Sequence, residues 1–289
     1  MLSRQSSYLA AIGWLLLINL ISSLNDAIAC FMGQDISPIQ ITFWRCLVTV
    51  LSVLPFMKNH FKTKQPRLHA YRALWGALAL GATTFAVVKL PLLKNTCLNF
   101  SEPLFMLPLS VLFLHEKLTY GRIICTVLGF CGIFITAYTD LKTWNLWIFV
   151  PLLSAFAFSV LNLLAKKMVV HETIPTMLFY FGLGTPLLFL IPALNVWKPL
   201  SGMQYGLLTL LGINGNLMQV CMFKAYKLSD VSALMPFRYT EMLFTMLIGF
   251  VLFQQVPTFN VLSGGIIIVL STLILLKHRT KGLITFNFF

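Results

Sequence analysis

Five ionisable side chains interrupt long apolar stretches of this sequence, at positions where a charge is costly and a function is therefore expected. Three are carboxylates and two are guanidinium groups: Asp26, Glu102, Glu241, Arg45 and Arg238. If these stretches cross a lipid bilayer, each charge costs at least about 2.5–3.5 kcal/mol on insertion scales. Buried carboxylates suit the binding of cations or protons, and a guanidinium group suits a carboxylate, which it can hold by two parallel hydrogen bonds.

Each of the five also has a purely structural interpretation. Arg238 precedes Glu241 by three positions, so the two share one helix face and can form a structural ion pair. Arg45 can neutralise Asp26 or Glu102 inside the protein, and Asp26 lies near enough to the end of its stretch to be interfacial. Glu102 has no partner on its own helix, so we expect it to meet substrate or a proton. Our hypothesis for the pair is that Arg238 binds a substrate carboxylate, while Glu241 orients Arg238 and meets a substrate cation.

Polar and aromatic residues near these charges complete the candidate site. Asn25 adjoins Asp26, and Asn162 lies in a similar stretch later in the chain. Asn216 belongs to a cluster, with Asn214, Gly215 and Gln219, that is too polar for lipid contact, so we expect it to face a cavity. The aromatic candidates flank Glu102 and Arg238; most such rings pack, but a few stack on a heterocycle or hold a cation. The candidate substrate ligands added by this argument are Asn25, Asn162, Asn216, Phe100 and Tyr239.

The composition indicates a membrane protein. Of 289 residues, 58% are apolar and only 10% are charged, against about 25% in an ordinary soluble domain. The net charge of +13 is carried in short gaps between apolar runs, which favours loops retained in the cytoplasm over nucleic-acid binding. No CxxC pair, Walker-type loop, HExxH or GxSxG pattern occurs, so we expect no metal, cofactor or enzymatic activity.

Hydropathy predicts an all-α membrane protein with ten transmembrane helices. The spans lie near residues 8–31, 37–57, 70–88, 95–115, 120–138, 145–165, 174–194, 203–223, 232–253 and 259–276. Alternate gaps, each counted with the first three residues of the span that follows it, hold 15 and 4 of the 21 Lys and Arg residues, and the remaining 2 lie deeper inside spans. This bias predicts both termini in the cytoplasm of a bacterial cell, with a multi-pass chain in the inner membrane.

The two halves of the sequence resemble each other. Ser23–Asn25 matches Val160–Asn162 at an offset of 137, and Phe100–Phe105 matches Tyr239–Phe244 at an offset of 139, with one Glu in each. Five spans per half is an odd number, so the second half enters the membrane from the opposite side. The prediction is two inverted five-helix repeats, residues 1–140 and 141–289, an architecture that many secondary transporters use.

These features resemble the drug/metabolite transporter superfamily over nearly the whole chain. The resemblance includes the ends of spans four and nine, Leu114–Thr119 and Phe253–Thr258. Glu116 matches the acidic residue that usually ends the fourth span there, whereas Gln255 departs from it in the second half. A closer similarity is to the S-adenosylmethionine uptake transporters of intracellular bacteria, in the segments Ile12–Trp14, Ser22–Ala27, Lys166–Val170, Met177–Tyr180 and Pro236–Glu241.

The resemblance implies uptake of S-adenosylmethionine, with exchange for S-adenosylhomocysteine as a further implication. The residues themselves suit that ligand, which carries a sulfonium, an ammonium, a carboxylate and an adenine, but they also suit a plain amino acid. An exporter of amino acids or other zwitterions is therefore an alternative, and a membrane-embedded enzyme or lipid flippase is an alternative of another class. The expected partners are a small-molecule substrate and the lipid bilayer, for a monomer or a homodimer.

Overall fold

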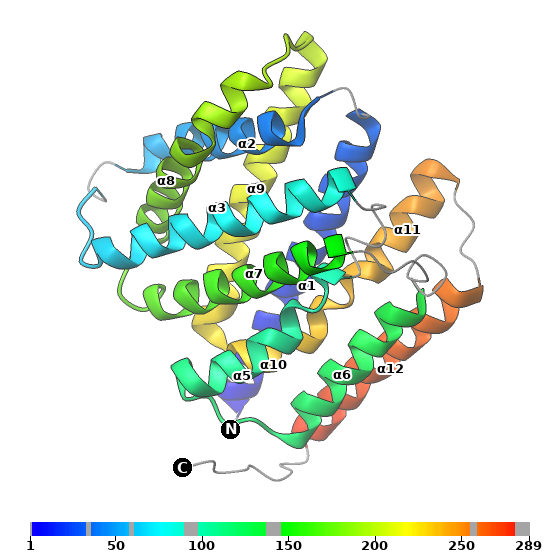
Figure 1. The fold of residues 1–289 in the computed structure, drawn as a ribbon. Coiled ribbons are helices and arrows are strands. Elements are labelled where there is room, and N and C mark those ends of the chain that lie inside the picture. Colours follow the sequence, from blue (N-terminus) through cyan, green and yellow to red (C-terminus); the bar gives the residue numbers. More distant parts are fainter. Residues whose placement is uncertain are drawn as a thin grey trace.

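The computed structural model describes residues 2–32, 36–57, 61–89, 98–136, 146–254 and 259–280, and the elements within these ranges are helices (Figure 1). In chain order they are α1 (Leu2–Met32), α2 (Pro38–Val53), η1 (Leu54–Phe56), α3 (Pro66–Lys89), α5 (Glu102–Leu114), α6 (Tyr120–Thr136), η2 (Leu146–Ile148), α7 (Phe149–Met168), α8 (Ile174–Asn195), α9 (Gly202–Leu228), α10 (Val231–Arg238), α11 (Glu241–Phe253) and α12 (Phe259–Thr280).

The predicted all-α membrane fold is confirmed. Five of the described helical segments are long and apolar enough to cross a bilayer, and three shorter apolar helices accompany them. The predicted spans correspond in order to α1, α2, α3, α5, α6, α7, α8, α9, the pair α10–α11, and α12. The first residues of the fourth span and the boundary predicted at residue 140 lie outside the described residues. Both α3 and α9 run past the predicted spans, into basic residues at the ends of the apolar stretches.

The helix contacts of one half recur between the equivalent helices of the other, as expected for two halves related by an approximate two-fold axis. α3 packs on α7, and its image, α9, packs on α1; α5 packs on α7, and its image, α11, packs on α1. In the pairs α6–α12 and α2–α8, each helix packs on its own equivalent from the other half. α6 and α12 lie side by side in Figure 1. The start of α1 and the end of α12 lie toward the same, lower end of that view. This is the packing expected of two inverted five-helix repeats.

The prediction of one continuous helix for the ninth span is wrong. α10 ends at Arg238, the backbone turns at Tyr239 and Thr240, and α11 begins at Glu241. Asn19 of α1 supports the break: its Nδ2 donates to the carbonyl oxygen of Phe237 and to Oγ1 of Thr240, both at 2.8 Å. The Phe237 carbonyl also accepts the N–H and the hydroxyl of Thr240, at 3.2 and 2.8 Å. It is therefore satisfied within the membrane, where an unpaired carbonyl would cost several kcal/mol.

The same break occurs in the fourth span, one repeat earlier. Residues 98 and 99 are helical, Phe100 and Ser101 form the turn, and α5 begins at Glu102. The backbone bonds from Ser101 N to Leu98 O and from Thr240 N to Phe237 O are equivalent at the offset of 139, with lengths of 3.1 and 3.2 Å. Such a 3₁₀ turn inside a helix often marks a functional hinge. Each break places a Glu on the first turn of a helix, where the helix dipole favours a negative charge.

Glycine residues let the symmetric pair α6–α12 approach closely. A Cβ at Gly132 of α6 would stand 2.9 Å from the carbonyl oxygen of Gly264 in α12, and one at Gly129 would stand 2.2 Å from the Tyr239 ring. Close backbone contact of this kind is how helices associate in lipid, where apolar side chains gain little by meeting one another. The broken spans are therefore packed against a tightly joined helix pair.

Candidate functional site

The centre of the candidate site is an arginine held between two carboxylates that come from different halves. Nη2 of Arg238 lies 3.7 Å from Oε2 of Glu102 and 3.8 Å from Oε2 of Glu241. Both carboxylate side chains are largely buried, whereas the Arg238 side chain is 24% exposed. The predicted i,i+3 contact within the second half is present, and a contact to the first half accompanies it. The two helix breaks thus bring three of the five predicted charges together.

Glu102 obtains its partners from other helices. Nδ2 of Asn162 in α7 donates to Oε1 of Glu102 at 2.6 Å, and the Ser159 hydroxyl, one turn earlier, donates to the Glu102 backbone carbonyl at 2.9 Å. Together with Arg238, these contacts hold both carboxylate oxygens. Two predicted site residues, Asn162 and Glu102, are therefore in direct contact.

Glu241 is held mainly through its backbone. Ser23 of α1 donates to the Glu241 carbonyl oxygen at 3.2 Å and also bonds Thr245, one turn further along α11, at 3.0 Å. The Ser22 side chain interacts with the carboxylate itself. Asn25 is the repeat equivalent of Asn162, yet it does not bond Glu241. The Glu241 carboxylate thus lacks the amide that fixes Glu102.

Asp26 and Arg45 form a second charged group next to Glu241. The Asp26 carboxylate interacts electrostatically with Glu241 and with Arg45. Asp26 is exposed and Arg45 is half-buried. The Arg45 guanidinium Nη2 lies 3.8 Å from the position that a Cβ at Gly215 of α9 would take. Arg45 acts electrostatically on Asp26, one of its two predicted partners, without an ion pair between them among the described contacts.

The amides of the polar cluster in α9 join helices to one another. Asn214 donates to Oδ1 of Asn25 at 2.9 Å, and Asn25 donates to the sulfur of Met218 at 3.4 Å. Asn216 donates to the hydroxyl of Ser52 in α2 at 2.6 Å and to the Thr49 carbonyl at 3.1 Å. These bonds fix α1 and α2 against α9 around Asp26 and Arg45. A direct role of Asn25 or Asn216 in substrate binding stays a prediction.

The aromatic candidates Phe100 and Tyr239 lie at equivalent positions of the two breaks and pack against each other. Their ring centroids are 6.3 Å apart, and both side chains belong to the apolar cluster between α6 and α12. Tyr239 is fully buried and Phe100 nearly so. The structure therefore places both rings in the packing of the helix pair.

Arg72 lies two residues inside the predicted third span, next to the basic loop that precedes it. Its side chain is fully buried; Nη1 donates to the Met177 carbonyl at 2.8 Å and Nη2 to the Gln219 side chain at 2.5 Å. The guanidinium carbon also lies 4.7 and 5.0 Å from the ring centroids of Phe181 and Phe223. Cation–π contacts of this kind stabilise a charge away from water. Arg72 joins α3, α8 and α9.

Two carboxylates join the halves at the end of the molecule where α1 begins. Oε1 of Glu116 accepts the Val231 N–H and Oε2 accepts the Ser232 N–H and hydroxyl, at 2.6–2.9 Å. Arg122 strengthens this contact, donating to the Ser232 hydroxyl at 2.8 Å and pairing with Asp230 at 3.0 Å. We call this group the Glu116 clamp. It ties the α5–α6 connection of the first half to the start of α10 in the second.

A second contact between the halves, which we call the Glu172 clamp, is made by a carboxylate of the second half. Glu172 Oε1 accepts the Thr63 hydroxyl at 2.6 Å and the backbone N–H groups of Lys64 and Gln65 at 2.9 and 3.2 Å. In both clamps a carboxylate of one half binds N–H groups at a helix start in the other half, where the helix dipole favours negative charge. This end of the molecule is closed by bonds between the halves.

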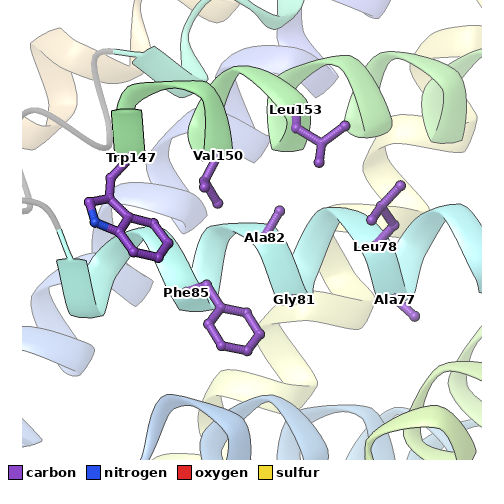
Figure 2. A pocket seen from close by; sticks show the side chains of 8 residues that line it. All are labelled: Ala77, Leu78, Gly81, Ala82, Phe85, Trp147, Val150 and Leu153. Carbon is purple, nitrogen blue, oxygen red and sulfur yellow. The ribbon is translucent and has the colours of Figure 1, made fainter. Parts of the chain in front are cut away.

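An apolar groove with a volume of about 350 Å³ lies between α3 and the start of α7 (Figure 2). It is lined by Ala77, Leu78, Gly81, Ala82, Phe85, Trp147, Val150 and Leu153. None of the predicted charged residues lines it. The groove is therefore a separate feature from the charged site.

The chain matches the model of the EamA-like transporter family over residues 9–138 and again over 145–277. It is 32% identical to the S-adenosylmethionine uptake transporter of Rickettsia felis, over 96% of each chain, and 30% identical to that of Rickettsia prowazekii, over the same share of each. It is 28% identical to the riboflavin transporter of Vibrio cholerae, over 81% of each chain.

A solved structure titled "Crystal structure of protein" has the same fold, with a TM-score of 0.79, 15% identity, and coverage of 96% of this chain and 99% of the other. The helical repeats, the paired broken spans and the two family matches agree with one another. This multi-pass membrane protein belongs to the EamA-like transporter family, within the drug/metabolite transporters.

Proposed function

We propose that this protein takes up S-adenosylmethionine across the bacterial inner membrane and exchanges it for S-adenosylhomocysteine. The observation that carries the proposal is the charge of the site. Three carboxylates and two guanidinium groups lie together, so the fully ionised site has one negative charge in excess. A ligand of net charge +1 neutralises this excess, and electrostatic complementarity of this kind favours its binding over that of neutral ligands.

S-adenosylmethionine has that net charge, because its sulfonium and ammonium exceed its single carboxylate by one. A zwitterionic amino acid is neutral and leaves the imbalance in place. The relatives of about 31% identity that are named as S-adenosylmethionine uptake transporters support the same choice of substrate. Riboflavin, the substrate in the name of a more distant relative, has no cationic group to meet the excess charge.

Uptake into proteoliposomes tests the proposal. Purified protein is expected to accumulate labelled S-adenosylmethionine, and excess unlabelled S-adenosylmethionine or S-adenosylhomocysteine to inhibit it, while methionine and riboflavin do not. Because the substrate is a cation, an inside-negative potential should increase uptake, by up to about 2.3 kcal/mol per 100 mV of driving force. Preloading with S-adenosylhomocysteine should accelerate entry if the protein exchanges the two. Equal inhibition by methionine would instead favour the amino-acid alternative.

The proposal includes an orientation with both termini in the cytoplasm. It is supported by the bias of 15 to 4 in Lys and Arg between alternate gaps. A reporter enzyme that works only in the cytoplasm should be active when fused after residue 289, and one that needs the periplasm should be inactive there. Activity of the periplasmic reporter would contradict the orientation.

A further inference from the structure

Two carboxylates of the site, Glu241 and Asp26, lie near enough to each other to interact as like charges. Arg238 lies between Glu102 and Glu241. Ser22 and Ser23 of α1 contact Glu241, and Asp26 follows them by one turn of the same helix and interacts with both Glu241 and Arg45. Neighbouring like charges destabilise each other unless a positive group or a proton relieves them, so a cationic ligand is favoured here.

The two arginines differ in what they can still bind. Arg238 already faces two carboxylates at 3.7 and 3.8 Å, so a third carboxylate would meet repulsion from both. The Arg45 guanidinium makes no hydrogen bond or close ion pair within the described part of the chain, and it acts electrostatically on Asp26. A guanidinium group has five N–H donors in a planar fork that matches a carboxylate. Of the two arginines, Arg45 is the one whose guanidinium N–H donors are available to bind a carboxylate.

The surroundings of Arg45 and Asp26 form a site that is open and rigid. Asp26 is exposed although it lies within α1, and an ionised carboxylate at that depth faces water and not lipid. The side-chain hydrogen bonds from Asn214 to α1 and from Asn216 to α2 hold α1, α2 and α9 together around the site. Gly215 lies between these two amides and leaves room beside the Arg45 guanidinium. Such preorganisation lowers the cost of ordering a bound ligand.

We propose that Arg45 binds the carboxylate of the substrate's amino-acid group, Asp26 binds its ammonium, and Glu241 faces the sulfonium, while Arg238 stays paired with Glu102. This assignment rests on the proposed function. The carboxylate and ammonium share one carbon of the ligand, as Arg45 and Asp26 are neighbours in the site. Two methylene groups separate that carbon from the sulfonium, which then extends toward Glu241. The assignment makes Arg45, and not Arg238, the residue that selects an amino-acid group.

Binding of three ligands to the purified full-length protein tests the assignment. S-adenosylmethionine has both the amino-acid group and the sulfonium, S-adenosylhomocysteine lacks the positive charge on sulfur, and 5′-methylthioadenosine lacks the amino-acid group and the charge. Each is titrated calorimetrically into wild type, Arg45→Gln, Arg45→Lys and Glu241→Gln. Arg67→Gln is the matched control, because Arg67 is exposed at the start of α3.

Arg45→Gln is expected to weaken both amino-acid ligands by about 30-fold or more, the loss typical of a buried charge pair, and to leave methylthioadenosine within about twofold of wild type. Arg45→Lys, which folds with the charge retained, should show the same selective loss in smaller degree. Glu241→Gln should weaken S-adenosylmethionine and spare S-adenosylhomocysteine. Arg67→Gln should match wild type for every ligand.

Two results separate the failure of this assignment from the failure of the proposed function. Wild-type protein that binds no S-adenosylmethionine overturns both. Wild-type binding, together with unchanged affinity in Arg45→Gln and Arg45→Lys, overturns the assignment alone. An equal loss of all three ligands in Arg45→Gln also overturns it, because Arg45 would then act on the site as a whole and not on the amino-acid group.

Discussion

The equivalent carboxylates of the two halves, Glu102 and Glu241, have different surroundings. Glu102 and Glu241 are equivalent by sequence, by the backbone bonds of the preceding turn and by their place at the start of a helix. Yet Glu102 is bonded by Asn162, whereas Asn25, the equivalent amide in the other half, bonds Asn214 and Met218. The duplicated backbone thus positions both carboxylates, and the residues that differ between the halves determine which one is fixed and which remains available.

The largest expected effect comes from removing the cation that joins the two halves. Arg238→Met leaves Glu102 and Glu241 facing each other, so it should lower the free energy of unfolding by about 3–5 kcal/mol, measured by thermal unfolding in detergent. Arg238→Met with Glu241→Leu should recover most of that stability, because Glu102 keeps Asn162, and yet remain inactive in uptake. Arg67→Met is the control. An active double variant would contradict a role for the pair in transport.

Removing the charge of one carboxylate at a time compares the halves directly. Glu102→Gln is expected to fold and to reduce uptake at least about tenfold, equivalent to 1.4 kcal/mol in binding or activation, because Arg238 loses one of its two anions. Expression, thermal stability and uptake are measured on the same preparations, beside Glu241→Gln. Uptake at the wild-type rate by well-expressed Glu102→Gln would show that only the second-half carboxylate serves transport.

The two amides should differ in what they contribute to stability. Asn162→Ala removes a hydrogen bond to a charged group, worth about 1.5–3 kcal/mol. Asn25→Ala removes a hydrogen bond between neutral amides, worth about 0.5–1.5 kcal/mol. Thermal unfolding of both variants measures the difference. Equal losses would mean that the two halves, though bonded differently, are equally dependent on these amides.

The smallest expected effect is local and concerns the two clamps. Glu116→Gln should accelerate hydrogen exchange at the backbone amides of Val231 and Ser232, by about a factor of five for a net loss near 1 kcal/mol. Exchange at Lys64 and Gln65, which Glu172 binds, should not change. Glu172→Gln should produce the reverse pattern. Simultaneous acceleration at both places in either variant would show that the clamps open as one unit.

Much of this architecture follows from the sequence because lipid imposes strong constraints. Long apolar runs predicted the spans, and the matched Glu102 and Glu241 predicted the repeat. The break at Tyr239 and Thr240 was missed because hydropathy records side chains, whereas a break depends on where the backbone carbonyls find donors. One donor at this break is Asn19, more than 200 residues away, and no local pattern reveals such a contact.

The residues that form the site were predicted better than the contacts among them. The five charges were selected because each is costly in lipid, and the structure brings them into one group. The contact of Arg238 with Glu102 joins different halves, so periodicity along one helix could not indicate it. The burial of Arg72 was missed because a basic residue near the end of a span ordinarily extends to water; here Phe181, Phe223 and Gln219 provide an alternative environment.

The Glu116 clamp makes the two faces of the transporter unequal. In an inverted repeat, the opposite-facing state arises when the halves exchange conformations, so each contact at one face should reappear at the other between repeat-equivalent residues. The equivalents of Glu116 and Arg122 are Gln255 and Val261, which carry no charge and cannot form the charged contacts of this clamp. We therefore expect the state that is closed at the Glu116 face to be more stable than the opposite-facing state, in which these charged contacts have no counterpart.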